Sequence, residues 1–251
     1  MGTGPCDLAP PSLRVKIIKH HLLFDDATEI AQRFQRVIDA MRATNKQESL
    51  AMSNLTDTDN GLNGLRHGKQ PDQAVAQRSA LPAHVVADLR TDHAGETGAV
   101  CIYQGVLHFS KDPGLRDFAQ RHMATEQDHL RQIEEWLPSQ ARSALLPVWR
   151  VAGWLTGALP ALLGPRAVYA TIEAVERFVD HHYETQVRSL EAHPALQSLR
   201  QTLLACQGDE VAHRDEAAAA RGPQSLGVGL RAWCGLVDVV SRGAVFISRY
   251  I

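Results

Sequence analysis

Two stretches of this sequence, Glu126-Gln-Asp-His129 and Glu210-Val-Ala-His213, decide its fold, because each is a Glu-x-x-His motif. Each motif follows a lone glutamate, Glu96 by thirty residues in the first case and Glu176 by thirty-four in the second. Residues three apart in a helix share one face, so both side chains of a motif can reach the same ion. Four glutamates and two histidines drawn from four helices are the ligand set of a carboxylate-bridged di-iron or di-manganese centre. The sequence therefore predicts a redox-metal enzyme.

Apolar residues recur every three or four positions from about residue 83 onward, and no long stretch alternates as a β-strand does. A glutamate that points into a core is strongly disfavoured unless a cation compensates its charge. A single Glu-x-x-His is common on solvated helices. Two copies in matching register, each with its own lone glutamate on the apolar side, favour a buried metal centre over chance. The four stretches that carry them are 86–107, 115–136, 172–190 and 196–217.

A long apolar connection, residues 137–167, joins the second helical stretch to the third. An up-down bundle needs only a short loop there, so its length predicts a ferritin-like crossover. Arg150, two prolines and several glycines interrupt it. These interruptions favour a segment that dips into one membrane leaflet, or covers an apolar pocket, over one that spans a membrane. The alternative is a buried crossover helix. The residues expected to line a channel toward the metal are Trp149, Trp154, Leu155, Leu159 and Leu163.

The C-terminal stretch, residues 226–246, has the period of an amphipathic helix. Three arginines, Arg231, Arg242 and Arg249, could face anionic lipid head groups from it. It could equally be a fifth helix packed on the bundle or on a second subunit. The predicted fold class is therefore all-α: a ferritin-like four-helix bundle with a long apolar crossover and an additional C-terminal amphipathic helix.

The composition of the chain indicates which partners and which cellular compartment to expect. The net charge of −2 gives nucleic acid no electrostatic reason to bind. The four cysteines form no Cys-x-x-Cys pair, which favours a reducing compartment over a disulfide framework. Residues 1–80 are expected to be a variable, largely disordered extension, with Met52 an alternative start, and residues 81–251 the metal-binding domain. The start lacks the pattern of a signal peptide, and its acidic residues disfavour a mitochondrial transit peptide.

Several longer motifs resemble the demethoxyubiquinone hydroxylases of ubiquinone biosynthesis, which are ferritin-like di-iron monooxygenases. The resemblance covers about residues 85–251. The Ala-Gly-Glu and Val-Glu…His-His-Tyr elements are its most specific parts. The matching stretches are Arg90-Thr-Asp-His-Ala-Gly-Glu96-Thr-Gly-Ala99, Glu126-Gln-Asp-His129-Leu130, Leu146-Pro147-Val148-Trp149, Ala174-Val-Glu176 with His181-His182-Tyr183, and Asp209-Glu210-Val-Ala-His213.

The resemblance implies particular roles for the site residues. It implies Glu176 rather than Glu173 as the ligand before the His-His-Tyr element, and it places His182 and Tyr183 near the metal, as electron or substrate contacts. The alternative for Tyr183 is core packing. We also expect Asp209 to orient His129, unless it is merely solvated. The implied ligands of two iron ions are Glu96, Glu126, His129, Glu176, Glu210 and His213.

The resemblance also implies an activity. The protein would hydroxylate the ring of demethoxyubiquinol (2-polyprenyl-3-methyl-6-methoxy-1,4-benzoquinol) with O₂ and reducing equivalents from NADH. No Gly-x-Gly-x-x-Gly fingerprint is present, so an irregular NADH contact, a partner or the quinol itself would deliver the electrons. The alternatives are an iron-storage or ferroxidase protein and a membrane scaffold with a vestigial site.

The location and partners follow from the same resemblance. We expect a peripheral protein on the cytoplasmic face of a bacterial cell membrane, or alternatively on the matrix side of the mitochondrial inner membrane. Its expected partners are the polyprenyl benzoquinol substrate, a membrane lipid surface and a lipid-presenting protein of ubiquinone biosynthesis. We also expect a homo-oligomer.

Overall fold

The structure is a computed structural model that describes residues 81–251. This range is built of α-helices and two short 3₁₀ turns and contains no strand, which confirms the all-α prediction. The prediction for residues 1–80 lies outside the described range. The elements are α3 (Ala83–Phe109), α4 (Pro113–Trp136), η1 (Ser139–Ala141), α5 (Leu146–Ala161), α6 (Pro165–Ser189), η2 (Pro194–Leu196), α7 (Gln197–Arg221) and α8 (Val228–Ser248).

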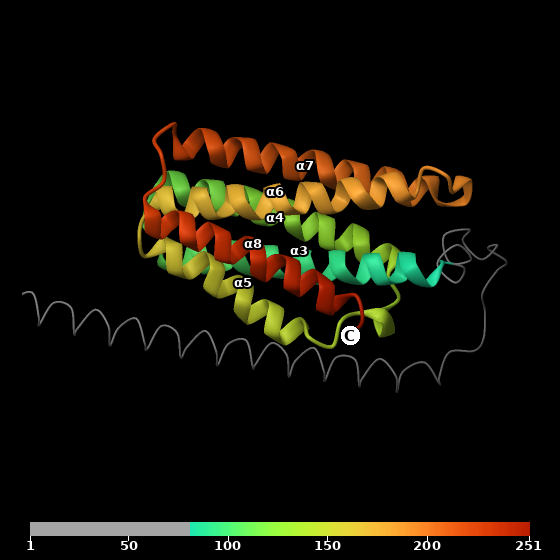
Figure 1. The fold of residues 1–251 in the computed structure, drawn as a ribbon. Coiled ribbons are helices and arrows are strands. Elements are labelled where there is room, and N and C mark those ends of the chain that lie inside the picture. The colour runs from blue at the N-terminus through green and yellow to red at the C-terminus, as the bar shows by residue number, and fades with distance from the viewer. Residues whose placement is uncertain (1–80) are drawn as a thin grey trace, which may run out of the picture. The chain divides into compact units, whose positions relative to one another are not determined.

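Four long helices, α3, α4, α6 and α7, form the ferritin-like bundle (Figure 1). Helix α3 packs on α4, α4 on α7, and α7 on α6. The remaining side of the bundle, between α3 and α6, is covered by α5 and α8, which both pack against these two helices. The crossover and the C-terminal helix therefore form a second layer over one side of the bundle.

Local sequence signals fix the helix ends. The Asp112 side chain accepts a hydrogen bond from the Leu115 amide at 2.8 Å and caps α4, with Pro113 in the first turn. Gly164 and Gly222 adopt positive φ angles of 103° and 78°, which glycine tolerates best. Gly164 precedes Pro165 at the start of α6, and Gly222 ends α7. These breaks make the turns that return each helix to the bundle.

Two clusters of buried apolar side chains lie at the two ends of the bundle. One includes Leu89, Ile133 and Leu203, and the other includes Val106, Phe118 and Ile172. Along each of the four bundle helices, the predicted ligands fall between the residues of these two clusters. The charged layer is therefore sealed by apolar packing on either side.

The crossover helix α5 lies unusually close to α3. A Cβ at Gly153 would overlap the carbonyl oxygen of Gly98, and a Cβ at Gly157 would overlap that of Ile102. Glycine is required at both positions, since any side chain would push the helices apart. One face of α5 is thus buried on the bundle, as the buried-crossover alternative requires. The other face exposes the large apolar side chains of Val148, Val151 and Leu159, and Leu162 and Leu163 are exposed just after the helix ends.

The C-terminal helix α8 packs on the bundle through Trp233 and Val237, so the fifth-helix alternative is confirmed. Two of the arginines expected to face lipid have partners within the chain. Arg249 forms an ion pair with Asp88, and Arg242 forms one with Asp238 on its own helix. Among the residues that the structure describes, no helix has both the length and the apolar composition needed to cross a membrane.

Candidate metal centre

The structure brings all six predicted ligands together in the middle of the bundle. Each of the four helices contributes: α3 through Glu96, α6 through Glu176, and α4 and α7 through one Glu-x-x-His motif each. All six are buried, and the four glutamates are between 0% and 3% exposed. The sequence register therefore predicted the position of every one of these side chains.

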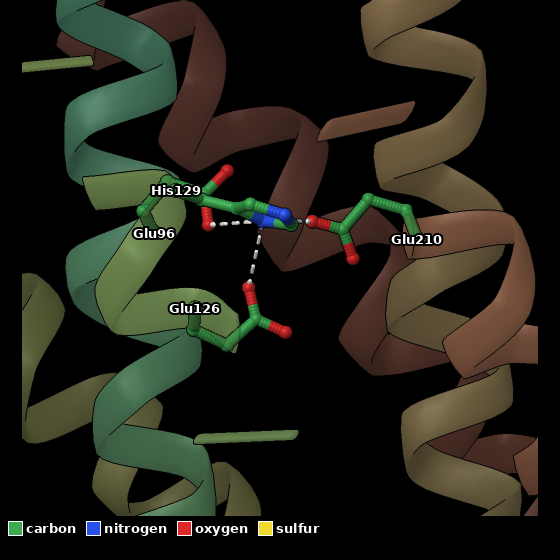
Figure 2. A group of neighbouring side chains, drawn as sticks. All are labelled: Glu96, Glu126, His129 and Glu210. Atoms are coloured by element: carbon green, nitrogen blue, oxygen red, sulfur yellow. Dashed lines mark ion pairs between the residues drawn. The ribbon is translucent and has the colours of Figure 1, made fainter. Parts of the chain in front are cut away.

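The first group surrounds Nδ1 of His129. This atom lies 3.1 Å from a carboxylate oxygen of Glu210, 3.5 Å from one of Glu126 and 3.8 Å from one of Glu96. Figure 2 shows the imidazole ring between these three carboxylates, which come from three different helices. One ion placed among them could be reached by all four side chains.

The second group surrounds Nδ1 of His213. This atom lies 3.0 Å from Oε1 of Glu126 and 3.5 Å from Oε2 of Glu210, with Glu176 completing the group. Glu126 and Glu210 belong to both groups, and each turns one oxygen toward His129 and the other toward His213. They can therefore bridge two ions, while Glu96 and Glu176 can each bind one.

The donor set fits a pair of divalent cations. Both carboxylate oxygens of Glu126, one of Glu210, and Nδ1 of both histidines are buried without a hydrogen-bond partner among the described residues. Unpaired buried groups of this kind are costly, so their convergence indicates a missing ligand. Four ionised glutamates and two neutral histidines carry a charge of −4, which two dications would neutralise. Mixed carboxylate and imidazole donors suit iron and manganese.

The protonation of the site without a cation reflects crowding of like charges. Burial, followed by the carboxylates of Glu210 and Glu126, raises the pKa of Glu176 well above its usual value. Burial alone would lower the pKa of His213, but the close carboxylates of Glu126 and Glu210 outweigh burial and raise the pKa to about 9. The same opposition raises the pKa of His129. Without a cation, the groups of this cluster therefore hold protons more tightly than they would in water.

Two buried tyrosines hold the outer glutamates. The Tyr183 hydroxyl donates a hydrogen bond to Glu96, and the Tyr103 hydroxyl donates one to Glu176 at 3.2 Å. Each glutamate is thus oriented by a tyrosine from the other outer-ligand helix. Tyr183 was predicted near the site, but Tyr103 was not, although it lies seven residues after Glu96 on the same apolar stripe. Only the helical spacing of Tyr103 from Glu96 pointed to a place in the site, and packing in the apolar core explains that spacing equally well.

His182 lies beside Asp92 rather than among the six ligands. Its Nε2 atom is 3.1 Å from Oδ1 of Asp92 and 3.1 Å from the Thr91 hydroxyl. Burial raises the pKa of Asp92, opposed by the hydrogen bonds from His182 and Gln186. Asp92 is buried one helical turn before Glu96 and was missed by the sequence reasoning, although it stands inside the Arg90–Ala99 motif.

His122, which the sequence reasoning did not identify as a site residue, packs against His213. Their ring centroids are 4.0 Å apart, and Nε2 of His122 lies 2.9 Å from a carboxylate oxygen of Glu216. Burial, followed by the nearby His213, lowers the pKa of His122 to about 4. Arg121 is the main cause that lowers the pKa of Glu216 to about 2. Neutral His122 therefore supports the His213 ring without adding positive charge to the cluster.

Asp209 contacts His129 as predicted. Its Oδ2 atom accepts a hydrogen bond from Nε2 of His129 at 3.1 Å, although the Asp209 side chain is 56% exposed. Since Nε2 donates to Asp209, Nδ1 is the nitrogen that faces the carboxylates and would bind a cation in place of a proton. The alternative that Asp209 is merely solvated is wrong for this structure.

Replacing Asp209 with alanine is expected to weaken metal binding about 10- to 100-fold, because the His129 ring loses the partner that fixes its orientation and tautomer. Iron retention in competition with a chelator measures this directly. Asp215→Ala is the matched control, since Asp215 is exposed on the same helix and pairs with Arg214. Equal iron retention by the two variants would show that the Asp209 contact has no role in binding.

A cavity of about 200 Å³ opens beside the cluster, between α3, α5, α6 and α8. Its walls are mostly apolar, and Glu96, Glu126, Glu176 and Glu210 form its inner end. Of the five residues expected to line a channel, only Trp149 lines it. Trp154 instead packs on His108 and Phe109, and Leu159 and Leu163 are exposed. The period of an apolar helix could not reveal which of its faces α3 would cover.

The chain is similar to the members of one known protein family. Residues 83–248 match the family model described as ubiquinone biosynthesis protein COQ7. A mitochondrial NADPH-dependent 3-demethoxyubiquinone 3-hydroxylase from Bos taurus is 35% identical over 131 residues, which are 51% of this chain and 60% of the relative. A 3-demethoxyubiquinol 3-hydroxylase from Rhodospirillum rubrum is 39% identical over 130 residues, with the same coverage.

A longer alignment exists with a more distant relative. A mitochondrial NADPH-dependent 3-demethoxyubiquinone 3-hydroxylase from Caenorhabditis elegans is 27% identical over 184 residues, 70% of this chain and 94% of the relative. The first two alignments, by contrast, span only 60% of those relatives' length.

Proposed function

We propose a function from the premise that this chain belongs to the COQ7 family of ubiquinone biosynthesis proteins: it is a 3-demethoxyubiquinol 3-hydroxylase. In this proposal Glu96, Glu126, His129, Glu176, Glu210 and His213 bind two iron ions, and the substrate is a polyprenyl benzoquinol. One atom of O₂ enters the ring, and the other leaves as water with two electrons and two protons.

The observation that carries this proposal is the cavity that ends on the metal-ligand cluster. An apolar protein cavity of about 150 Å³ is enough to hold benzene, so about 200 Å³ accommodates one substituted ring. Four ligand carboxylates lie at its inner end, so a ring bound there would stand directly beside the metal pair. The alternative of an iron-storage protein, which we weighed from the sequence, gives no reason for an apolar, ring-sized cavity at this place.

The protein residues position the substrate and exclude water. The two iron ions would supply O₂ activation, which none of the amino-acid side chains can provide. Apolar residues of α5 and α8 would contact the bound ring, while Tyr183 and Tyr103 hold Glu96 and Glu176 by hydrogen bonds. His182 and Tyr183 both line the cavity, and we propose that they contact the substrate or the electron path.

The electrons in this proposal come from a reduced nicotinamide nucleotide. The names of the mitochondrial relatives specify NADPH, whereas the sequence resemblance led us to expect NADH. The chain has no Gly-x-Gly-x-x-Gly fingerprint. We therefore propose that either nucleotide acts through the quinol or a partner protein.

We further propose that the chain works on a membrane surface. The exposed apolar residues of α5 and the exposed Leu236, Val239 and Phe246 of α8 lie on the two helices that cover the cavity. Such a face suits insertion into one leaflet, where a polyprenyl quinol resides. We propose that this surface is the cytoplasmic face of a bacterial cell membrane or, alternatively, the matrix side of the mitochondrial inner membrane. The word mitochondrial in the names of several relatives supports the second location. A homo-oligomer and a lipid-presenting partner remain part of this proposal.

The quinones of a cell that lacks this gene test the function. We expect the demethoxy precursor to accumulate, and wild-type protein to restore the mature quinone, whereas Glu176→Ala should not. Glu173→Ala is the matched control, because Glu173 lies one turn earlier on α6 and pairs with Arg177 and Arg221 outside the cluster. An unchanged quinone profile in the deleted cell would rule the hydroxylase out.

A further inference from the structure

One oxygen of the Asp92 carboxylate is buried and unpaired at the wall of the cavity. Asp92 is 3% exposed, and its Oδ2 atom has no hydrogen-bond partner among residues 81–251. Asp92 also lines the cavity that leads to the metal cluster. Leaving a buried carboxylate oxygen unsatisfied is costly, so this atom requires a hydrogen-bond donor that residues 81–251 do not supply.

The other oxygen of the same carboxylate is firmly held. Oδ1 accepts a hydrogen bond from Nε2 of Gln186 at 2.7 Å and lies 3.1 Å from Nε2 of His182. His182 and Gln186 are one turn apart on α6, which faces Asp92 across the bundle. Since both neighbours approach Oδ1, the carboxylate cannot turn away without losing them. They are positioning residues that keep Oδ2 available as an acceptor.

A donor of opposite character lines the same cavity. Nε1 of Trp149 is buried without a partner in the described part of the chain, and an indole N–H can only donate. Gly153 packs on Gly98 and Gly157 on Ile102, so one turn earlier Trp149 lies level with Ala94. The unpaired acceptor of Asp92 and the unpaired donor of Trp149 thus lie at nearly the same level along the axis of α3. This level is half a turn to one turn before Glu96.

We propose that Oδ2 of Asp92 accepts a hydrogen bond from a ring hydroxyl of the benzoquinol, and so makes the cavity selective for the reduced ring. This inference rests on the proposed function. A quinol offers two O–H donors, whereas the oxidised quinone offers only carbonyl acceptors, which a carboxylate oxygen repels. The Trp149 N–H can donate to an oxygen of either ring. Asp92 therefore distinguishes the two oxidation states, and Trp149 does not.

Binding without turnover tests this inference. The ligands are a short-tailed 6-methoxy-3-methyl-1,4-benzoquinol and the corresponding quinone, titrated by calorimetry into the iron-loaded full chain under argon, with the ring absorbance verifying its oxidation state. Wild-type protein is expected to bind the quinol at least about tenfold more tightly, the size of a hydrogen bond to a charged group. Asp92→Asn should abolish or invert this preference, because the amide oxygen will face Gln186 and the amide nitrogen will take the place of Oδ2.

Asp180→Asn is the matched control, since Asp180 also accepts from a glutamine, Gln207, but does not line the cavity. Its quinol preference should equal that of the wild type. If Asp92→Asn fails to fold, the wild-type protein still decides, because methylating one of the two quinol hydroxyls should weaken binding about tenfold and methylating the other much less. Unchanged binding of both methyl ethers would overturn the inference.

The two proposals fail in different ways. Wild-type protein that binds neither ring would count against the proposed function and the role of Asp92 together. Wild-type protein that binds quinol and quinone equally, or an Asp92→Asn variant that keeps the wild-type preference, would overturn the role of Asp92 and leave the hydroxylase proposal intact.

Discussion

Glu210→Ala is expected to remove both of the proposed metal ions and to lower the proposed hydroxylation at least about 100-fold, because such a metal pair would supply several kcal/mol of catalysis. Glu210 turns one carboxylate oxygen toward His129 and the other toward His213, so its loss weakens both halves of the centre at once. The alanine also leaves a cavity where a buried side chain bridged two helices. Metal analysis after ferrous loading under argon, together with product formation, measures the effect.

The outer glutamates provide a graded comparison. Glu96→Ala removes a ligand that belongs to one group only. It is therefore expected to reduce the iron content by about half and to abolish turnover. Glu135→Ala is the neutral control, because Glu135 is exposed on α4, the helix that carries Glu126 and His129. Two irons per chain in the Glu210→Ala protein would contradict the bridging assignment.

Removing the metal is expected to make the stability of the protein fall steeply as the pH rises. The pKa of His213 is about 9 in the folded, metal-free chain, above the usual value of 6.5. The folded state then keeps a proton that the unfolded state has released, so the stabilisation is complete below pH 6.5 and is lost by pH 9. A shift of this size corresponds to on the order of 3 kcal/mol.

Glu176 acts in the same direction. Its raised pKa means that the folded chain still holds a proton after the unfolded carboxyl has ionised, so stability declines as the pH rises above about 4.5. Denaturant unfolding of chelator-treated protein between pH 6 and 9 measures the slope. Iron-loaded protein is the control and should lack it, because cations replace the protons. Glu176→Gln should flatten the slope of the metal-free protein, and a stability that rises with pH would contradict the prediction.

Much of the centre could be predicted from the chain alone, for a simple reason. Helical period and the cost of an unpaired buried charge act locally, so four glutamates in register on apolar stripes already require a compensating cation. The contact of Asp209 with His129 was also predicted, because Asp209 is next to Glu210 in the chain, and the structure confirms it. For the second layer, formed by α5 and α8, the sequence predicted the helices but not what they cover. An apolar helix can cover a neighbouring helix, a cavity or a lipid surface with the same pattern.

Tertiary structure decided what lies between the helices. The glycines of α5 allow it to press against α3, which turns Trp149 toward the cavity and Leu159 and Leu163 away from it. Packing likewise pairs each outer glutamate with a tyrosine from another helix, and it leaves one oxygen of Asp92 without a partner in the described range, residues 81–251. The sequence by itself determined the helices and the inward position of the six candidate ligands, since both depend on spacing within a helix. The shape and polarity of the cavity depend on contacts between residues far apart in the chain, and only the assembled bundle defines them.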